Sequence, residues 1–168
     1  MFNKEMVFKK IINDPYQVVD EMVEGIVLAH GDLLKFANNN KRAVVRKDAP
    51  IKDKVGVLIG GGSGHEPAFL GYVGKGLADG AAIGNVFASP SPDPIVDATK
   101  EINGGKGVVY MYGNYAGDIM NFDMAAEMCQ MEDIPVKTVL VTDDIASAPI
   151  ENKSERRGVA GDFYVFKI

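Results

Sequence analysis

Cysteine, tryptophan and long apolar runs are what this sequence has least of. Its 168 residues include one cysteine and no tryptophan, and a single cysteine excludes an internal disulfide framework. Cys129 lies in an apolar stretch with helical spacing that includes Met124 and Met128, which predicts a buried, unreactive thiol. No apolar run approaches the roughly 20 residues of a membrane span, and the sequence does not open with a secretion-leader pattern. We therefore expect a protein of the cytoplasm, without a membrane segment.

An excess of basic residues is also missing. The net charge is −5 and the isoelectric point is near 5.0, whereas non-specific nucleic-acid binding needs patches of lysine and arginine. We therefore expect no nucleic-acid partner. Hydrophobic residues make up 46% of the chain and charged residues 24%, which is typical of a soluble globular protein. The length predicts one domain over residues 1–168.

The last residues, 163–168, are strongly apolar and have strand propensity. Such a segment needs a covering layer, from a partner or from further chain. We therefore expect the sequence to be the front part of a longer protein, ending before a second domain.

Helices and strands are expected to alternate along the chain. Asn13 or Asp14 can cap a first helix, and Pro15 suits its first turn. This helix carries an apolar stripe at three- and four-residue spacing and is expected to end near Gly31. Further helices are expected at 69–73, 94–102 (capped by Asp93) and 118–131, and strands at 43–45, 55–59, 80–85, 108–112 and 136–141. Strands separated by helical segments predict an α/β fold, a largely parallel sheet with helices on both faces.

A glycine cluster, GGGSGHEP at residues 60–67, follows a predicted buried strand. Ligands of open α/β sheets bind at the carboxyl ends of the strands, and glycines let backbone N–H groups approach a ligand closely. The cluster has neither the Gly-Lys-Ser/Thr of a phosphate-binding loop nor the spacing of a dinucleotide fingerprint. It therefore predicts a site for a small polar molecule other than a nucleotide, although a tight turn alone would also explain the glycines.

His65 and Asp118 are the residues best suited to acid–base chemistry. Both follow strands, so both are expected at one edge of the sheet. A carboxylate beside an imidazole can remove a proton from a hydroxyl group. The alternatives are that His65 only bonds a loop carbonyl and that Asp118 only caps a helix. His30 is expected to cap a helix end or lie on the surface.

Three other groups of polar residues have weaker functional interpretations. Ser89 and Ser91 lie in a proline-rich turn and could bond a ligand, but turn formation accounts for them. Asp143 and Asp144 lack further metal ligands at useful spacing, so capping or solvation is the better interpretation. The two arginines at 156–157 could meet a phosphate or a partner's carboxylate, although exposed arginines usually do neither.

Five motifs in the same order resemble the dihydroxyacetone kinases, specifically their dihydroxyacetone-binding subunit (DhaK). The resemblance covers nearly the whole chain. The motifs are INDP at 12–15, GGGSGHEP at 60–67, Phe87 with SP at 89–90 and PD at 92–93, NY at 114–115 with GD at 117–118 and NF at 121–122, and RRGVA at 156–160.

The resemblance implies specific roles in the site. A small ketose such as dihydroxyacetone would lie against Gly61, Gly62 and Ser63. His65 would hydrogen-bond this ketose, and Asp118 would be the base on the hydroxyl that receives the phosphoryl group. The phosphoryl donor would be ATP or ADP with Mg on another domain or subunit, or a phosphoenolpyruvate-fed relay. No cofactor or metal would be bound by this chain, and a homodimer is implied.

Two departures from the family pattern are visible. The family anchors its ketose covalently on a histidine from the second half of the subunit, and this sequence has only His30 and His65. Family members often have lysine where this chain has Gly113, so a larger ketose such as erythrulose could use the space. The last residues resemble the start of a family helix.

The leading interpretation is therefore the substrate-binding part of a dihydroxyacetone (glycerone) kinase of glycerol metabolism. The alternatives are a kinase for a four-carbon ketose and a non-catalytic, ketose-sensing co-regulator of the same fold. A hydrolase is disfavoured because Ser63 does not lie in a nucleophile-elbow motif.

Overall fold

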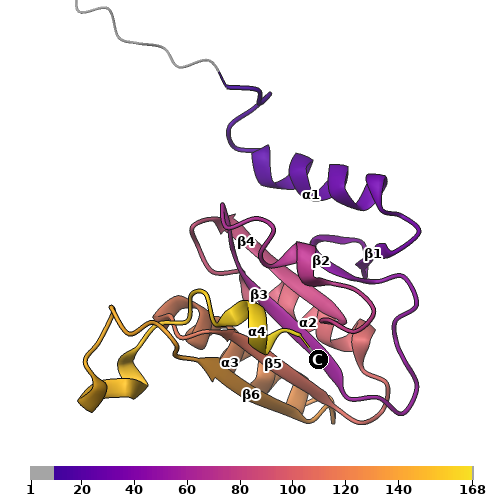
Figure 1. Ribbon diagram of the computed structural model, residues 1–168. Helices are drawn as coiled ribbons and strands as arrows, with labels where there is room; N and C mark the ends of the chain where they lie inside the picture. The colour runs from indigo at the N-terminus through magenta and orange to yellow at the C-terminus, as the bar shows by residue number, and fades with distance from the viewer. Residues whose placement is uncertain (1–9, 168) are drawn as a thin grey trace, which may run out of the picture.

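A six-stranded sheet forms the centre of the computed structural model, which describes residues 10–167 (Figure 1). The strand order is β1-β2-β4-β3-β5-β6. Strands β4, β3, β5 and β6 run parallel to one another, while β1 and β2 pair in antiparallel fashion at one side. The largely parallel sheet is therefore confirmed. The strands are β1 (Leu34–Ala37), β2 (Asn40–Arg46), β3 (Gly56–Ser63), β4 (Gly80–Val86), β5 (Val108–Gly113) and β6 (Val136–Val141).

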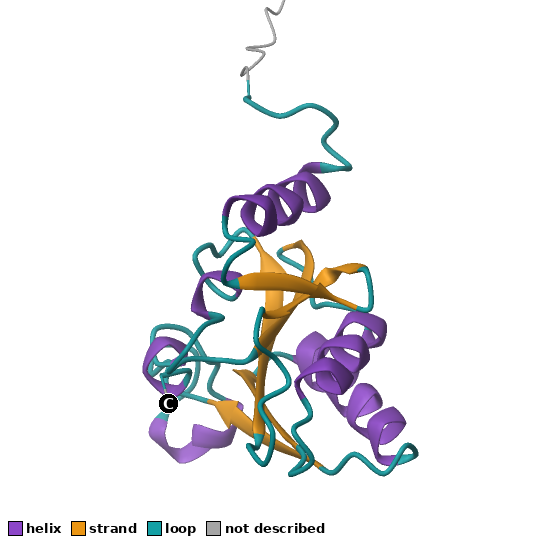
Figure 2. Ribbon diagram, turned by 90° about the vertical axis from the view of Figure 1, so that its right-hand side faces the viewer, coloured by secondary structure: helices purple, strands orange, loops and turns teal. Residues whose placement is uncertain are grey.

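Helices cover both faces of the sheet, as expected. Helices α2 (Pro92–Ile102) and α3 (Ala116–Gln130) pack against each other over one face. Helix α1 (Val18–Ala29), the 3₁₀ turn η1 (Leu70–Tyr72) and the short helix α4 (Asp162–Val165) belong to the other side, where α1 and η1 supply much of a second apolar core. Figure 2 shows α2 and α3 together on one side of the sheet. No helix within residues 10–167 combines the length and apolar character needed to cross a bilayer.

Helix α1 buries one face through Val19, Val23 and Val27, which recur every four residues. The expected cap at Asp14 is wrong. The helix begins at Val18, and Asp14 instead accepts a hydrogen bond from the Tyr16 N–H in the preceding turn. The Asp14 carboxylate therefore stabilises the turn before the helix and does not reach the N–H groups of the first helical turn. At the other end His30 is the exposed C-cap residue, in agreement with expectation.

The glycine cluster is not a loop along its whole length, which corrects the sequence-based expectation. Strand β3 runs through it to Ser63 and pairs with β4, with Gly61 opposite Ile83 and Gly62 opposite Gly84. A Cβ on Gly61 would lie 2.1 Å from the Phe69 ring, and one on Gly62 would lie 2.7 Å from the Ala88 nitrogen. These glycines are needed because other groups pack directly on the strand.

Several element boundaries also differ from expectation. Helix α2 starts at Pro92 after Ser91 as N-cap residue, so Asp93 lies inside the helix. The helix expected at 69–73 is reduced to η1, and β1 was not expected. Residues 162–165 form α4 rather than a strand, which agrees with the family resemblance.

The C-terminal segment is anchored by one aromatic side chain. Phe166 is fully buried, with its ring 5.9 Å from that of Phe69 and 6.2 Å from that of Tyr72. A buried ring at this position folds the segment back over the sheet, and propensity alone does not contain this information. Residue 168 lies outside the described residues.

Candidate active site

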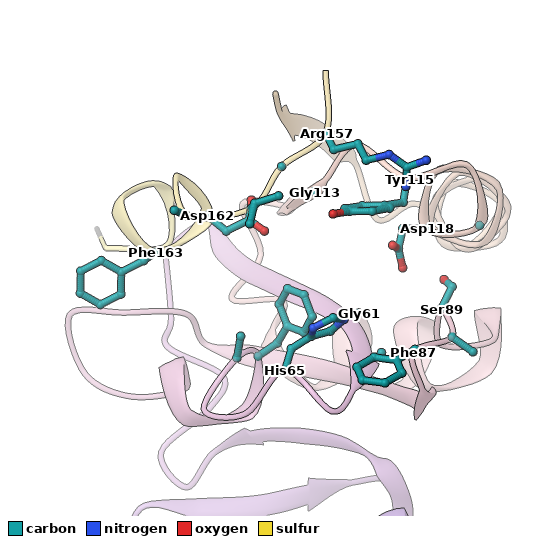
Figure 3. A pocket seen from close by; sticks show the side chains of 18 of the residues that line it. Gly61, His65, Phe87, Ser89, Gly113, Tyr115, Asp118, Arg157, Asp162 and Phe163 are labelled. Carbon is teal, nitrogen blue, oxygen red and sulfur yellow. The ribbon is translucent and has the colours of Figure 1, made fainter. Parts of the chain in front are cut away.

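A cavity of about 670 Å³ opens at the carboxyl ends of the central strands (Figure 3). The segments after β3, β4 and β5 each contribute to its wall, and a fourth segment, 157–163, closes one side. Parallel strands deliver the ends of three separate βα connections to one edge, and this is where open α/β sheets bind ligands.

Four of the five predicted site residues meet in this cavity: Gly61, Gly62, His65 and Asp118 line it. Ser63 is the exception. Its side chain is buried (3% exposed), and its hydroxyl donates a 2.8 Å hydrogen bond to the Gly84 carbonyl. The pairing of β3 with β4 is irregular between Gly62 and Ser63, and the Ser63 side chain is bound to the neighbouring strand instead of lining the cavity. The expectation that the Ser63 hydroxyl lines the site is therefore corrected.

Asp118 is the third residue of α3, and the N-cap residue is Tyr115, without a side-chain capping bond. A capping role for Asp118 is thus wrong. Its Oδ1 atom is buried and has no hydrogen-bond partner among residues 10–167. Burial raises the pKa of this carboxyl above its usual range, while the Ser89 hydroxyl and the charge on His65 act in the opposite direction. A partly desolvated carboxylate with one unpartnered oxygen is well suited to accept a proton from a bound hydroxyl.

His65 stands between two aromatic rings on the opposite wall. Its ring centroid is 5.3 Å from that of Phe87 and 6.4 Å from that of Phe69. Phe87 is 72% exposed and has a left-handed backbone with φ 53°, a conformation that is unusual for a bulky residue and is enriched at functional sites. Figure 3 shows His65 and Phe87 facing Asp118 and Tyr115 across the cavity.

Tyr115 and Arg157 form the remaining wall. The Arg157 guanidinium lies 4.9 Å from the centroid of the Tyr115 ring, a cation–π contact. The amide of Asn114 donates hydrogen bonds to the carbonyls of Ser154 (3.0 Å) and Arg156 (2.8 Å). Asn114 therefore holds the arginine-containing segment beside the cavity. The contact between the NY motif at 114–115 and the RRGVA motif at 156–160 could have been suspected only because both belong to the family pattern.

Asp162 was not singled out from the sequence, yet it lines the same cavity. Its Oδ1 atom is buried and unpartnered among residues 10–167. Burial, followed by the charges of Asp143 and Asp118, raises the pKa of Asp162 to about 7. The local sequence gives no signal for this, because residues 163–168 suggest a strand.

The other candidates have structural roles. Ser89 lines the cavity and accepts a 3.2 Å hydrogen bond from the Asn121 amide. Asp143 accepts the N–H groups of Val159 and Gly161 at 2.9 and 2.8 Å, so it fastens the 159–161 segment and does not cap a helix as one of the expected alternatives had it. Cys129 is fully buried, as predicted. Residues 10–167 contain no cluster of three or more histidine, cysteine or acidic side chains placed to hold a metal ion.

The fold and the cavity define a class: an open α/β domain with a histidine and a carboxylate in a cavity at one edge of its sheet. A family model narrows this class, because the Dak1 domain matches residues 24–168. The chain belongs to the Dak1 family.

Two curated relatives illustrate the likeness in sequence. The chain is 56% identical over 159 residues to the dihydroxyacetone-binding subunit DhaK of a PTS-dependent dihydroxyacetone kinase 2 from Listeria innocua, covering 95% of this chain and 47% of that protein. It is 46% identical over 158 residues to an L-erythrulose 1-kinase from Mycolicibacterium smegmatis, covering 94% of this chain and 27% of that protein. The chain thus spans about half, or less, of the length of the curated relatives it matches.

Two solved structures are similar in fold. The dihydroxyacetone kinase from C. freundii in complex with AMP-PNP and Mg²⁺ superposes with a TM-score of 0.85 at 36% identity, covering 95% of this chain and 30% of that one. A dihydroxyacetone kinase operon co-activator, Dha-DhaQ, superposes with a TM-score of 0.78 at 33% identity, covering 89% of this chain and 45% of that one. The same fold therefore occurs in an enzyme and in a co-activator.

Proposed function

We propose that this chain is the substrate-binding part of a dihydroxyacetone kinase. It would hold a small ketose while a terminal hydroxyl receives a phosphoryl group from a donor on another domain or subunit. The observation that carries the proposal is the buried, unpartnered Oδ1 of Asp118 in the same cavity as His65. Membership in the Dak1 family and the names of the relatives support the substrate class.

In the proposed reaction Asp118 takes the proton of the terminal hydroxyl as the hydroxyl oxygen bonds to phosphorus and the bond from phosphorus to its donor breaks. His65 hydrogen-bonds the ketose, and Gly61 and Gly62 form the floor on which the ketose rests. Positioning and a correctly placed base are the main contributions that a protein can make to phosphoryl transfer. The raised pKa of Asp118 increases its basicity towards the hydroxyl.

The donor, the assembly and the compartment remain predictions. We propose ATP or ADP with Mg, or a phosphoenolpyruvate-fed relay, on a partner domain or subunit. A homodimer in the cytoplasm is also proposed. The absence of a phosphate-binding loop motif from the sequence supports placing the nucleotide elsewhere.

A ligand-sensing co-regulator is the second candidate, because the co-activator Dha-DhaQ has a similar fold. Asp118 favours the enzyme: a sensor needs ligand contacts, but it has no need for a desolvated base beside the bound hydroxyl. The two candidates therefore differ in the expected effect of removing the Asp118 charge.

The test is Asp118→Asn in the full-length protein assayed with its phosphoryl donor. We expect kcat to fall by at least about 100-fold, since the amide cannot accept the proton, while binding of dihydroxyacetone, measured by calorimetry, persists. Asp123→Asn is the matched control, because Asp123 lies on the same helix and is exposed. Turnover retained in Asp118→Asn would remove the base assignment.

A further inference from the structure

No side-chain hydrogen bond within residues 10–167 accounts for the position of Asp162. It is the first residue of α4, but the N-cap residue is Gly161, and no side chain caps this helix. Its carboxylate makes no hydrogen bond within residues 10–167, and its Oδ1 is buried. Nearby Asp143, by contrast, is saturated by two backbone N–H groups. A buried polar atom without a partner is costly and calls for an explanation.

Two glycines lie directly against this carboxylate, and Oδ1 is buried on the Gly158 side. A Cβ on Gly113 would lie 3.3 Å from Asp162 Oδ2, and a Cβ on Gly158 would lie 2.7 Å from Oδ1. A larger residue at either position would press on the carboxylate. Gly113, Gly158 and Asp162 all line the cavity, and Figure 3 shows Asp162 beside Gly113, with the Tyr115 ring between it and Asp118.

The electrostatics of the site favour a neutral, hydroxyl-bearing ligand at Asp162. Burial and the neighbouring charges of Asp143 and Asp118 raise the pKa of Asp162 to about 7, so both of its protonation states are accessible near neutral pH. A hydroxyl group can donate to the carboxylate and accept from the carboxylic acid, and so it pairs with either state. An anionic ligand group here would add to the charges of Asp118 and Asp143.

We propose that Asp162 is a specificity-determining residue that hydrogen-bonds the hydroxyl that a four-carbon ketose carries beyond the carbons of dihydroxyacetone. The assignment rests on the proposed function, since Asp118 must receive the reacting hydroxyl. The cavity of about 670 Å³ leaves room for the longer ketose. A site built to bond a hydroxyl discriminates against a substrate that lacks it, because its polar group is then left unpaired.

The test compares kcat/KM for L-erythrulose, D-erythrulose and dihydroxyacetone in the full-length protein and in Asp162→Ala. We expect the variant to lose about tenfold in kcat/KM for one or both erythruloses, the value of one hydrogen bond, and to stay within about threefold for dihydroxyacetone. Asp162→Asn, which keeps the shape and a hydrogen-bonding group, should lose less than Asp162→Ala. Asp123→Asn, which lies outside the cavity, should leave kcat/KM unchanged for all three ketoses.

Two results would overturn the assignment alone: equal losses for all three ketoses, or unchanged kcat/KM for both erythruloses in Asp162→Ala. Wild-type protein that phosphorylates none of the three would overturn the proposed function together with this assignment. A direct binding measurement separates this role from a failure to fold. A folded Asp162→Asn should bind erythrulose more weakly than wild type and should bind dihydroxyacetone equally well, whereas a misfolded variant would bind neither.

Discussion

Three aspartates, Asp118 and Asp162 in the cavity wall and Asp143 behind it, differ in pKa because their surroundings differ. Burial raises the pKa of Asp118 and, together with Asp143 and Asp118, that of Asp162. Burial acts to raise the pKa of Asp143 as well, but the hydrogen bonds from the Val159 and Gly161 N–H groups outweigh burial, and the pKa of Asp143 is lowered. The carboxylate that supports the loop is thus kept charged, and the two that face the cavity are left without such support.

A pH dependence of stability follows from Asp162. Its folded pKa of about 7 lies above the unfolded value of 3.8, so the folded state binds more protons between these two values. The contribution of Asp162 to stability is therefore greatest below the unfolded pKa and is lost as pH rises towards 7. Asp162→Asn should remove this loss, making the protein more stable than wild type at pH 8 by on the order of 1 kcal/mol after allowance for partial exposure.

Urea unfolding of both proteins at pH 5 and pH 8 measures this difference. The gain in the variant should be larger at pH 8 than at pH 5, because pH 5 lies only a short way above the unfolded pKa of 3.8. A variant that is equally or more destabilised at pH 8 than at pH 5 would show that the charged form is well accommodated in the folded state.

At the scale of the elements, the close packing on β3 explains the glycines better than ligand approach does. The Phe69 ring lies where a side chain on Gly61 would be. We expect Gly61→Ala to displace Phe69, a cavity residue, to destabilise the protein by about 1–3 kcal/mol, and to weaken ketose binding. Thermal unfolding and calorimetry measure the two effects.

Gly74→Ala is the matched control for this prediction, because a Cβ at Gly74 meets no atom within 4 Å. It should leave stability within about 0.5 kcal/mol and binding unchanged. If the two variants behaved alike, the packing argument for Gly61 would fail.

Asp79 connects three strands from a buried position. It is 2% exposed, accepts hydrogen bonds from Arg46 (3.0 Å) and the Val57 N–H (2.9 Å), and pairs with Lys54. We expect Asp79→Ala to cost about 3–5 kcal/mol, since it leaves Arg46 buried without this partner. Chemical denaturation measures the loss.

Asp53→Asn provides the comparison for a surface pair. Asp53 is exposed, and its oxygen lies 3.9 Å from the Lys106 ammonium. Asparagine also tolerates its left-handed backbone, φ 60°. The expected change is below about 0.5 kcal/mol, and a loss as large as that of Asp79→Ala would contradict the distinction between buried and surface pairs.

At the scale of the whole molecule, the two histidines occupy separate environments. His65 lines the cavity, and His30 is the exposed C-cap of α1. We expect NMR titration with dihydroxyacetone or erythrulose to shift the imidazole signals of His65 and leave those of His30 in place. ATP should shift neither, because the nucleotide is proposed to bind elsewhere.

Equal shifts of both histidines would indicate non-specific binding. A His65 response to ATP without one to either ketose would reverse the proposed division between substrate and nucleotide sites. Silence towards both ketoses would count against a competent site in this chain.

The sequence by itself determined the alternation of helices and strands, the largely parallel sheet and the convergence of His65 and Asp118. These follow from local periodicity and from the rule that parallel strands deliver their following residues to one edge. The five ordered motifs added the family, which the Dak1 match confirms.

Only the tertiary structure decided which way individual groups point and what they meet. In the structure the Ser63 hydroxyl bonds the neighbouring strand, and Asp118 lies inside α3 and does not cap it. Asp162 packs against Gly113 and Gly158 at the cavity. Burial and the absence of a partner depend on residues far apart in the chain, such as the segment at 157–163 that folds back over β5. Local sequence cannot encode these contacts, because each exists only once distant elements have packed together.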